Sequence, residues 1–312
     1  MINQKLAVVF PGQGSQSVGM LHKLALEAPV ILKTFEEASE VLGYDLWRLA
    51  QEGPLEKLSQ TTYTQPALLA AGVALWRLHL DNAPLKPRYL AGHSLGEYTA
   101  LVCANALGFQ EAVQLVALRG QLMQEAVPEG QGAMAAILGL DDLAVAELCE
   151  AVSLENPTET VSPANYNTVG QVVIAGHTTA VHRVLEQAKA AGARRSLLLP
   201  VSVPSHCALM KPAALHLAQA LEKIAFRTPL IPILHNSDVA EHQTASSIRQ
   251  ALVEQLSQPV QWVRTIRLIL AAGVQTVYEC GPGSVLCGLN RRIEPTIDCI
   301  GLSNRETACV PE

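Results

Sequence analysis

The segment of the chain whose residue types point most directly to chemistry is Gly-His-Ser-Leu-Gly, at residues 92–96. It matches the G-x-S-x-G pattern, in which a serine lies on a sharp turn between a strand and a helix. The apolar residues 89–91 predict the strand, and the pattern from residue 95 predicts the helix. We therefore predict that Ser94 is a nucleophile and that the backbone N–H of Leu95 points toward the reacting carbonyl.

A second glycine-rich loop, Pro-Gly-Gln-Gly-Ser-Gln at residues 11–16, follows the apolar run 6–10. A dinucleotide-binding loop is one interpretation, but Ser17 stands where the third glycine of G-x-G-x-x-G belongs, and no β-α-β unit with a ribose-binding acid follows. Serine enzymes with this kind of turn take one oxyanion N–H from an earlier strand-to-helix loop. We expect Gln13 to supply it.

A serine nucleophile needs a base, and the chain has nine histidines. His206 lies in a proline-punctuated loop, residues 200–206, between a predicted strand and a predicted helix, and loops at sheet ends often carry chemistry. His93 is expected to be a packed neighbour, and Glu97 an acid stabilised by the dipole of the helix that it begins. No acid in a convincing context is available to orient His206. A backbone carbonyl could accept its Nδ1–H instead, and the sequence leaves this choice open.

The elements that must position these residues alternate between short apolar strands and helical patterns. This alternation predicts an α/β fold with a mostly parallel sheet covered on both faces. Between residues 133 and 199 the pattern changes and fits a β-α-β-β-α-β insert of the ferredoxin-like kind. We place this subdomain at residues 127–197 and the core at 1–126 and 198–312. Strands are predicted at 6–10, 89–91, 133–138, 171–175, 196–199, 231–234 and 276–279. Helices are predicted at 65–80, on both sides of Gly108 between 95 and 123, and at 141–152, 177–191, 207–224, 246–256 and 262–271.

Composition limits the function classes. The formal net charge is −6 and no long basic run occurs, so nucleic acid is not an expected partner. No apolar run is long enough to span a bilayer, and residues 1–5 do not resemble the start of a signal peptide. We expect a cytoplasmic protein without a membrane partner. The seven cysteines are odd in number and form no C-x-x-C pair, so we expect reduced thiols and no metal site.

Seven segments, in order along the chain, resemble the malonyl-CoA:acyl carrier protein transacylases of bacterial fatty acid synthesis. They are residues 10–16, 92–97, 119–124, 132–136, 165–176, 200–206 and 279–283. The resemblance implies an α/β-hydrolase-like core with a ferredoxin-like subdomain and an active site in the cleft between them.

The resemblance also implies a role for each of several residues. Ser94 is the nucleophile and His206 the base, and Gln13 and Leu95 provide the oxyanion N–H groups. The backbone carbonyl of Gln255 orients the histidine. Arg119 pairs with the free carboxylate of malonyl, and Asn165 is a polar wall of the cleft. The helical pattern alone would predict an exposed arginine at 119, whereas a guanidinium can hold a carboxylate by two parallel hydrogen bonds.

The implied activity is malonyl transfer from malonyl-CoA to the phosphopantetheine thiol of acyl carrier protein through an acyl-serine, with no cofactor beyond the coenzyme A of the substrate. The residues alone leave a serine thioesterase or hydrolase open, as well as a polyketide-pathway acyltransferase and a non-catalytic docking module. For the carrier protein we expect a basic patch formed by Lys189, Arg194, Arg195, Arg291 and Arg292.

Overall fold

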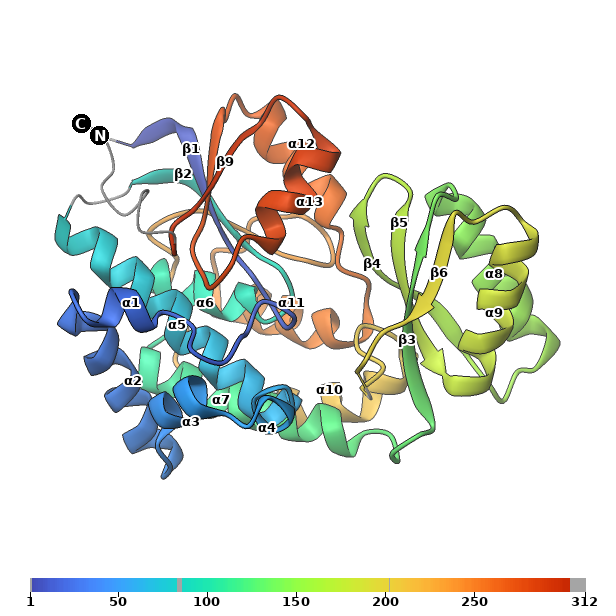
Figure 1. Cartoon of the computed structure of the whole chain (residues 1–312), viewed down its shortest axis with the longest axis horizontal. Coiled ribbons are helices and arrows are strands. Elements are labelled where there is room, and N and C mark those ends of the chain that lie inside the picture. The colour runs from blue at the N-terminus through green and yellow to red at the C-terminus, as the bar shows by residue number, and fades with distance from the viewer. Residues whose placement is uncertain (1, 83–85, 202, 304–312) are drawn as a thin grey trace.

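The computed structural model describes residues 2–82, 86–201 and 203–303 and contains two sheets (Figure 1). A five-stranded parallel sheet has the order β7-β2-β1-β8-β9, and a four-stranded antiparallel sheet has the order β4-β5-β3-β6. The parallel strands are β1 (Asn3–Phe10), β2 (Pro87–Gly92), β7 (Ile233–Leu234), β8 (Thr276–Glu279) and β9 (Asp298–Gly301). The predicted α/β class, with a parallel core sheet and a smaller second sheet, is confirmed.

Strand β1 shows why the core sheet forms where it does. Leu6, Val8 and Phe10 face one apolar cluster, while Ala7 and Val9 face another on the opposite side of the sheet. A strand buried on both faces needs apolar residues at every position, which is the pattern of this run.

Helices cover the two faces of the parallel sheet. One face is covered by a large group that includes α2 (Pro29–Leu42), α5 (Thr61–Asn82), α6 (Gly96–Cys103), α7 (Phe109–Glu125), α10 (Lys211–Leu221) and α11 (Ala245–Ser257). The short helices α1 (His22–Ala25), α3 (Leu46–Glu52), α4 (Leu55–Leu58) and the 3-10 turn η1 (Ala208–Met210) join them. The other face packs on α12 (Trp262–Ala271) and α13 (Val285–Ile293). Figure 1 shows these two helices on one side of the sheet and α1 to α7 on the other.

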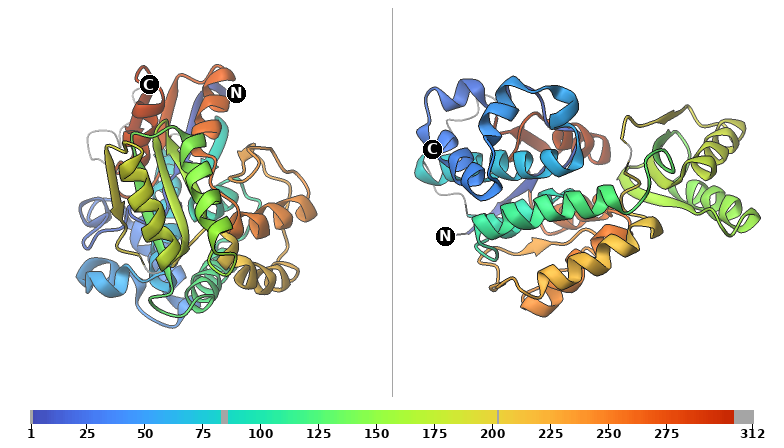
Figure 2. Two further views of the ribbon diagram at one scale, coloured as in Figure 1. Left: turned by 90° about the vertical axis from the view of Figure 1, so that its right-hand side faces the viewer. Right: turned by 90° about the horizontal axis from the view of Figure 1, so that it is seen from below.

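The second sheet forms a separate lobe, which faces the viewer in the left view of Figure 2. Its elements follow the order β3 (Gly132–Leu138), α8 (Asp142–Glu155), β4 (Val161–Thr168), β5 (Gln171–His177), α9 (Thr178–Ala190) and β6 (Arg195–Leu198). This is the β-α-β-β-α-β order that was predicted for the insert. Helices α8 and α9 cover one face of the sheet, and Cys207 and Leu209 of the core pack with its other face.

The lobe is also joined to the core through the main chain. Val260 forms a bridge with Asn165 of β4: its N–H donates to Ala164 O at 2.9 Å, and its carbonyl accepts from Tyr166 N at 2.9 Å. The start of the core segment that leads into α12 therefore continues the edge of the antiparallel sheet.

Most predicted elements lie within a few residues of their observed bounds, and α12 and β8 match them. No bounds were predicted from the sequence for the helices α1 to α4 that precede α5, and β4, α13 and β9 were not located. Six cysteines are free thiols, five of them buried, and Cys309 lies outside the described residues. Within the described ranges, no helix has the length and apolar character needed to cross a membrane.

Candidate active site

Ser94 lies on the turn between β2 and α6 in a left-handed conformation, with φ 51°. The flanking glycines are required because the chain segments approach too closely for side chains. A Cβ on Gly92 would lie 1.8 Å from Gly96 C, and a Cβ on Gly96 would lie 2.0 Å from Phe10 O. This is the strained turn of a nucleophile elbow, which holds the serine hydroxyl away from the sheet.

His206 lies directly beside the serine. Its Nε2 is 2.8 Å from Ser94 Oγ, and its Nδ1 is 2.7 Å from the backbone carbonyl of Gln255 in α11. A carbonyl can only accept, so Nδ1 carries the proton and Nε2 is free to accept from the hydroxyl. The question left open by the sequence is thereby answered: a backbone carbonyl, not an acid, orients this histidine.

The surroundings of His206 keep its ring neutral. Burial, aided by the nearby Arg119 cation, lowers the pKa of His206 to about 3, while the hydrogen bond to the Gln255 carbonyl acts in the opposite direction. The imidazole therefore stays unprotonated at physiological pH, which is the form that a general base must have.

The glycine-rich loop after β1 packs directly against the elbow. A Cβ on Gly12 would be 2.5 Å from His93 O and 3.7 Å from Leu95 N, so only glycine allows this approach. Gln13 and Leu95 both line the cleft that contains Ser94. Two backbone N–H groups from these loops can converge on one oxyanion, as the sequence predicts.

Arg119 is buried, with 1% of its surface exposed, and is not the exposed helix arginine that its pattern alone would predict. From α7 its Nη2 donates to Ser94 Oγ at 3.2 Å and to Gln255 Oε1 at 2.9 Å. Burial lowers the pKa of the guanidinium, while Tyr98 and Glu97 act to raise it. A buried cation beside a nucleophile is a ready partner for a substrate carboxylate.

One cleft of about 180 Å³ brings the predicted residues together. Gln13, Ser94, Leu95, Arg119, Asn165 and His206 all line it, whereas Gln255 lies behind its wall. Asn165 enters from β4, and much of the remaining lining is apolar, including Met123 and Val201. Ser202, part of the segment 200–206, lies outside the described residues.

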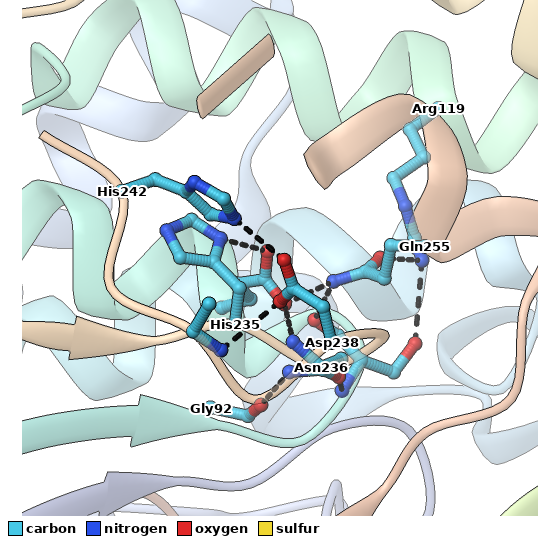
Figure 3. Close-up of polar contacts among 10 residues, drawn as sticks. Gly92, Arg119, His235, Asn236, Asp238, His242 and Gln255 are labelled. Atoms are coloured by element: carbon cyan, nitrogen blue, oxygen red, sulfur yellow. Dashed lines mark hydrogen bonds and ion pairs between the residues drawn. The ribbon is translucent and has the colours of Figure 1, made fainter. Parts of the chain in front are cut away.

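Several residues of the site were missed in the sequence. Gln65 lines the cleft with 2% of its surface exposed. The sequence feature that could have predicted this is a glutamine among the apolar positions of α5. Asn236 lies behind the elbow, where its Oδ1 accepts from Ser94 N at 2.7 Å and its Nδ2 donates to Gly92 O at 2.6 Å (Figure 3). The run Leu-His-Asn-Ser at residues 234–237 places polar residues at the end of a parallel strand, where sites form.

Comparison with known proteins first defines the class. The chain belongs to the acyl transferase domain family, which matches residues 7–298. Within that class it belongs to the malonyl-CoA:acyl carrier protein transacylases, as the resemblance implied. It is 56% identical over 299 residues to the malonyl CoA-acyl carrier protein transacylase of Salmonella typhimurium, and the match covers 96% of each chain.

Solved structures agree with this assignment. The malonyl CoA-acyl carrier protein transacylase of Coxiella burnetii superposes with a TM-score of 0.95 at 51% identity, over 97% of this chain and 95% of that one. A malonyl-transacylase solved in complex with a type II polyketide synthase acyl carrier protein superposes with a TM-score of 0.94 at 53% identity, over 97% of each chain.

Proposed function

We propose that this protein transfers malonyl from malonyl-CoA to the phosphopantetheine thiol of acyl carrier protein, with Ser94 as the acyl carrier. The observation that carries the proposal is the joint placement of His206 Nε2 and Arg119 Nη2 on Ser94 Oγ, at 2.8 and 3.2 Å. One group can take the hydroxyl proton, and the other can hold a carboxylate next to the reacting centre.

The first half-reaction forms the acyl-enzyme. Ser94 Oγ attacks the thioester carbonyl while its proton passes to His206 Nε2. The resulting oxyanion lies against the N–H groups of Gln13 and Leu95, and the imidazolium is stabilised by the Gln255 carbonyl at Nδ1. The tetrahedral species then collapses, the C–S bond breaks, and His206 returns the proton to the sulfur of coenzyme A as it leaves.

The second half-reaction repeats these steps in the opposite sense. The phosphopantetheine thiol gives its proton to His206 and attacks the ester carbonyl. Collapse of the second tetrahedral species breaks the bond to Ser94 Oγ, which recovers the proton from His206. Arg119 holds the malonyl carboxylate throughout, because a planar guanidinium can pair with it in two-pronged fashion.

The pathway and the compartment are further parts of the proposal. We assign the enzyme to fatty acid synthesis; a polyketide carrier protein is the alternative acceptor, since one similar transacylase was solved with such a partner. Free thiols at six described cysteines support a reducing compartment and hence the cytoplasm.

Intact-mass measurement after mixing with malonyl-CoA tests the proposal. We expect the wild type to gain one malonyl group and release one burst of coenzyme A, then to stop until carrier protein is added. Ser94→Ala should gain no mass. Continued release without an acceptor would indicate a hydrolase, and no release would indicate a docking module. A malonyl adduct on Ser94→Ala would contradict the assignment of the nucleophile.

A further inference from the structure

A buried carboxylate lies beneath the elbow without touching the cleft. Glu97 has no exposed surface and accepts three hydrogen bonds: from His235 Nδ1 at 2.7 Å, Asn236 N at 2.9 Å and Gln255 Nε2 at 2.9 Å. The favourable helix dipole expected from its place in α6 is only part of its environment. Figure 3 shows His235, Asn236 and Gln255 converging on this part of the structure.

The side chain of Gln255 joins this carboxylate to Arg119. Its Nε2 donates to Glu97 Oε2 and, at 3.0 Å, to Ser94 O, while its Oε1 accepts from Arg119 Nη2 at 2.9 Å. Carboxylates and carbonyls only accept, and a guanidinium only donates. The amide can therefore point only one way, with its oxygen toward Arg119.

Arg119 makes few other polar contacts. Among the described residues it forms no ion pair, and its Nε has no hydrogen-bond partner. Its guanidinium lies 5.3 Å from the centre of the Tyr98 ring, and its other hydrogen bond is to Ser94 Oγ, the atom that becomes acylated. The Ser94 hydroxyl becomes an ester oxygen in each cycle and is a poor permanent anchor. The Tyr98 ring offers a face but no directed acceptor, so Gln255 Oε1 is the hydrogen-bond acceptor that still holds the guanidinium after acylation.

We infer that the side chain of Gln255 is a positioning residue for malonyl selection: anchored by Glu97, it holds the Arg119 guanidinium at the distance from Ser94 that a malonyl carboxylate requires. This inference rests on the proposed function. It is separate from the role of the same residue's backbone carbonyl, which orients His206 and is present whatever the side chain.

Gln255→Met tests the inference, because it keeps the backbone carbonyl and an unbranched chain but removes both amide groups. The measurement is the ratio of loading rates for malonyl-CoA and acetyl-CoA, since acetyl has no carboxylate for Arg119. We expect the ratio to fall by roughly ten- to a hundredfold, the range for losing a hydrogen bond to a charged group. Gln250→Met is the matched control, because Gln250 is on the same helix and, within the described chain, its side chain is hydrogen-bonded to that of Glu254 alone. It should leave the ratio unchanged.

A double-mutant cycle shows whether the effect passes through Arg119. In an Arg119→Ala background, Gln255→Met should cause no further change in the ratio, since no guanidinium remains to be positioned. If Gln255→Met does not fold, Gln255→Ala removes the same two groups and replaces it in the cycle. A ratio that is unchanged in the folded variant, or that falls equally in both backgrounds, overturns the inference. Failure of the wild type to load malonyl at all would instead overturn the proposed function.

Discussion

At the scale of single residues, the most distinctive property of the site is an uncharged histidine. A free histidine loses half of its basic form near pH 6.5, whereas burial lowers the pKa of His206 to about 3. Because the neutral ring is the base, the rate constant for malonyl loading should stay level as the pH falls from about 8 to about 5. It should decline only in stronger acid, where the ring finally takes up a proton.

Stopped-flow release of coenzyme A across this range would test the expectation. His206→Ala provides the control and should load roughly 10²–10⁴-fold more slowly at every pH, the usual span for a missing general base. An inflection near pH 6.5 in the wild type that is absent from the variant would contradict the lowered pKa.

The second prediction at the scale of single residues concerns Arg119. Arg119→Ala should reduce malonyl loading far more than acetyl loading, because a buried carboxylate without a partner is strongly disfavoured. Acetyl loading should hold or rise, because the unpaired guanidinium that disfavours acetyl is gone. Arg119→Lys should restore little, since an ammonium lacks the planar two-pronged geometry. Equal losses for both substrates in both variants would show that Arg119 only supports the fold.

At the scale of elements, the elbow depends on two segments that cross at contact distance. Gly96→Ala would place a Cβ 2.0 Å from Phe10 O of β1, so we expect the free energy of unfolding to fall by about 3 kcal/mol or more. Gly288→Ala is the control, because a Cβ there meets nothing within 4 Å and the residue lies inside α13. That variant should be stabilised by roughly 0.5–1 kcal/mol through helix propensity. Urea titration of both variants gives the comparison, and similar midpoints would refute the steric account.

The observed helices and strands also show how much of the fold could be predicted from the sequence. Runs such as β1 and α12 carry an unbroken apolar or amphipathic pattern, and their bounds were predicted well. Strand β4 was not located, because register shifts at 163–165 and 166–168 break its alternation and it contains Pro163 and two asparagines. Helix α13 has an amphipathic pattern but only nine residues, one of them a glycine, and it was not recognised; β9 is a strand of only four residues near the end of the described chain.

The candidate site was predictable where a local motif marked it. Ser94 and the loop with Gln13 follow apolar strands, and His206 stands in a recognisable loop. The contacts of Arg119 with Gln255 and of Asn236 with Gly92 join positions 136 and 144 apart in the sequence. No local periodicity encodes such pairs, so the burial of Arg119 and the support beneath the elbow could be seen only once the chain was folded.

At the scale of the whole molecule, the basic patch remains a prediction. The fold brings Arg195 and Arg292 to the same end of the antiparallel sheet. Arg195 and Gln171 both pair with Leu138 at one end of the antiparallel sheet, and Arg292 Nη1 donates to Gln171 Oε1 at 3.1 Å. Lys189 lies in the last turn of α9, and Arg194 follows in the short connection to β6. Arg291 is already bonded to the carbonyl of Cys299.

Charge reversal tests the patch. Arg194→Glu combined with Arg195→Glu should slow transfer to an acidic carrier protein while leaving loading from malonyl-CoA intact, and added salt should reduce the difference. Lys23→Glu is the control, because it changes an exposed charge on α1, far from this lobe in Figure 1. If both half-reactions slow together, or neither does, the patch does not dock the carrier protein.

The junction at Val260 also determines how the protein comes apart. A lobe joined to a core only by its connecting segments can melt independently. Here, separation would leave the main-chain groups of Val260, Ala164 and Tyr166 without partners and would uncover the apolar face on which Cys207 packs. Unfolding the lobe on its own would therefore break these junction contacts in addition to the contacts inside the lobe. The two lobes should accordingly melt as one cooperative unit, in a single calorimetric transition rather than two.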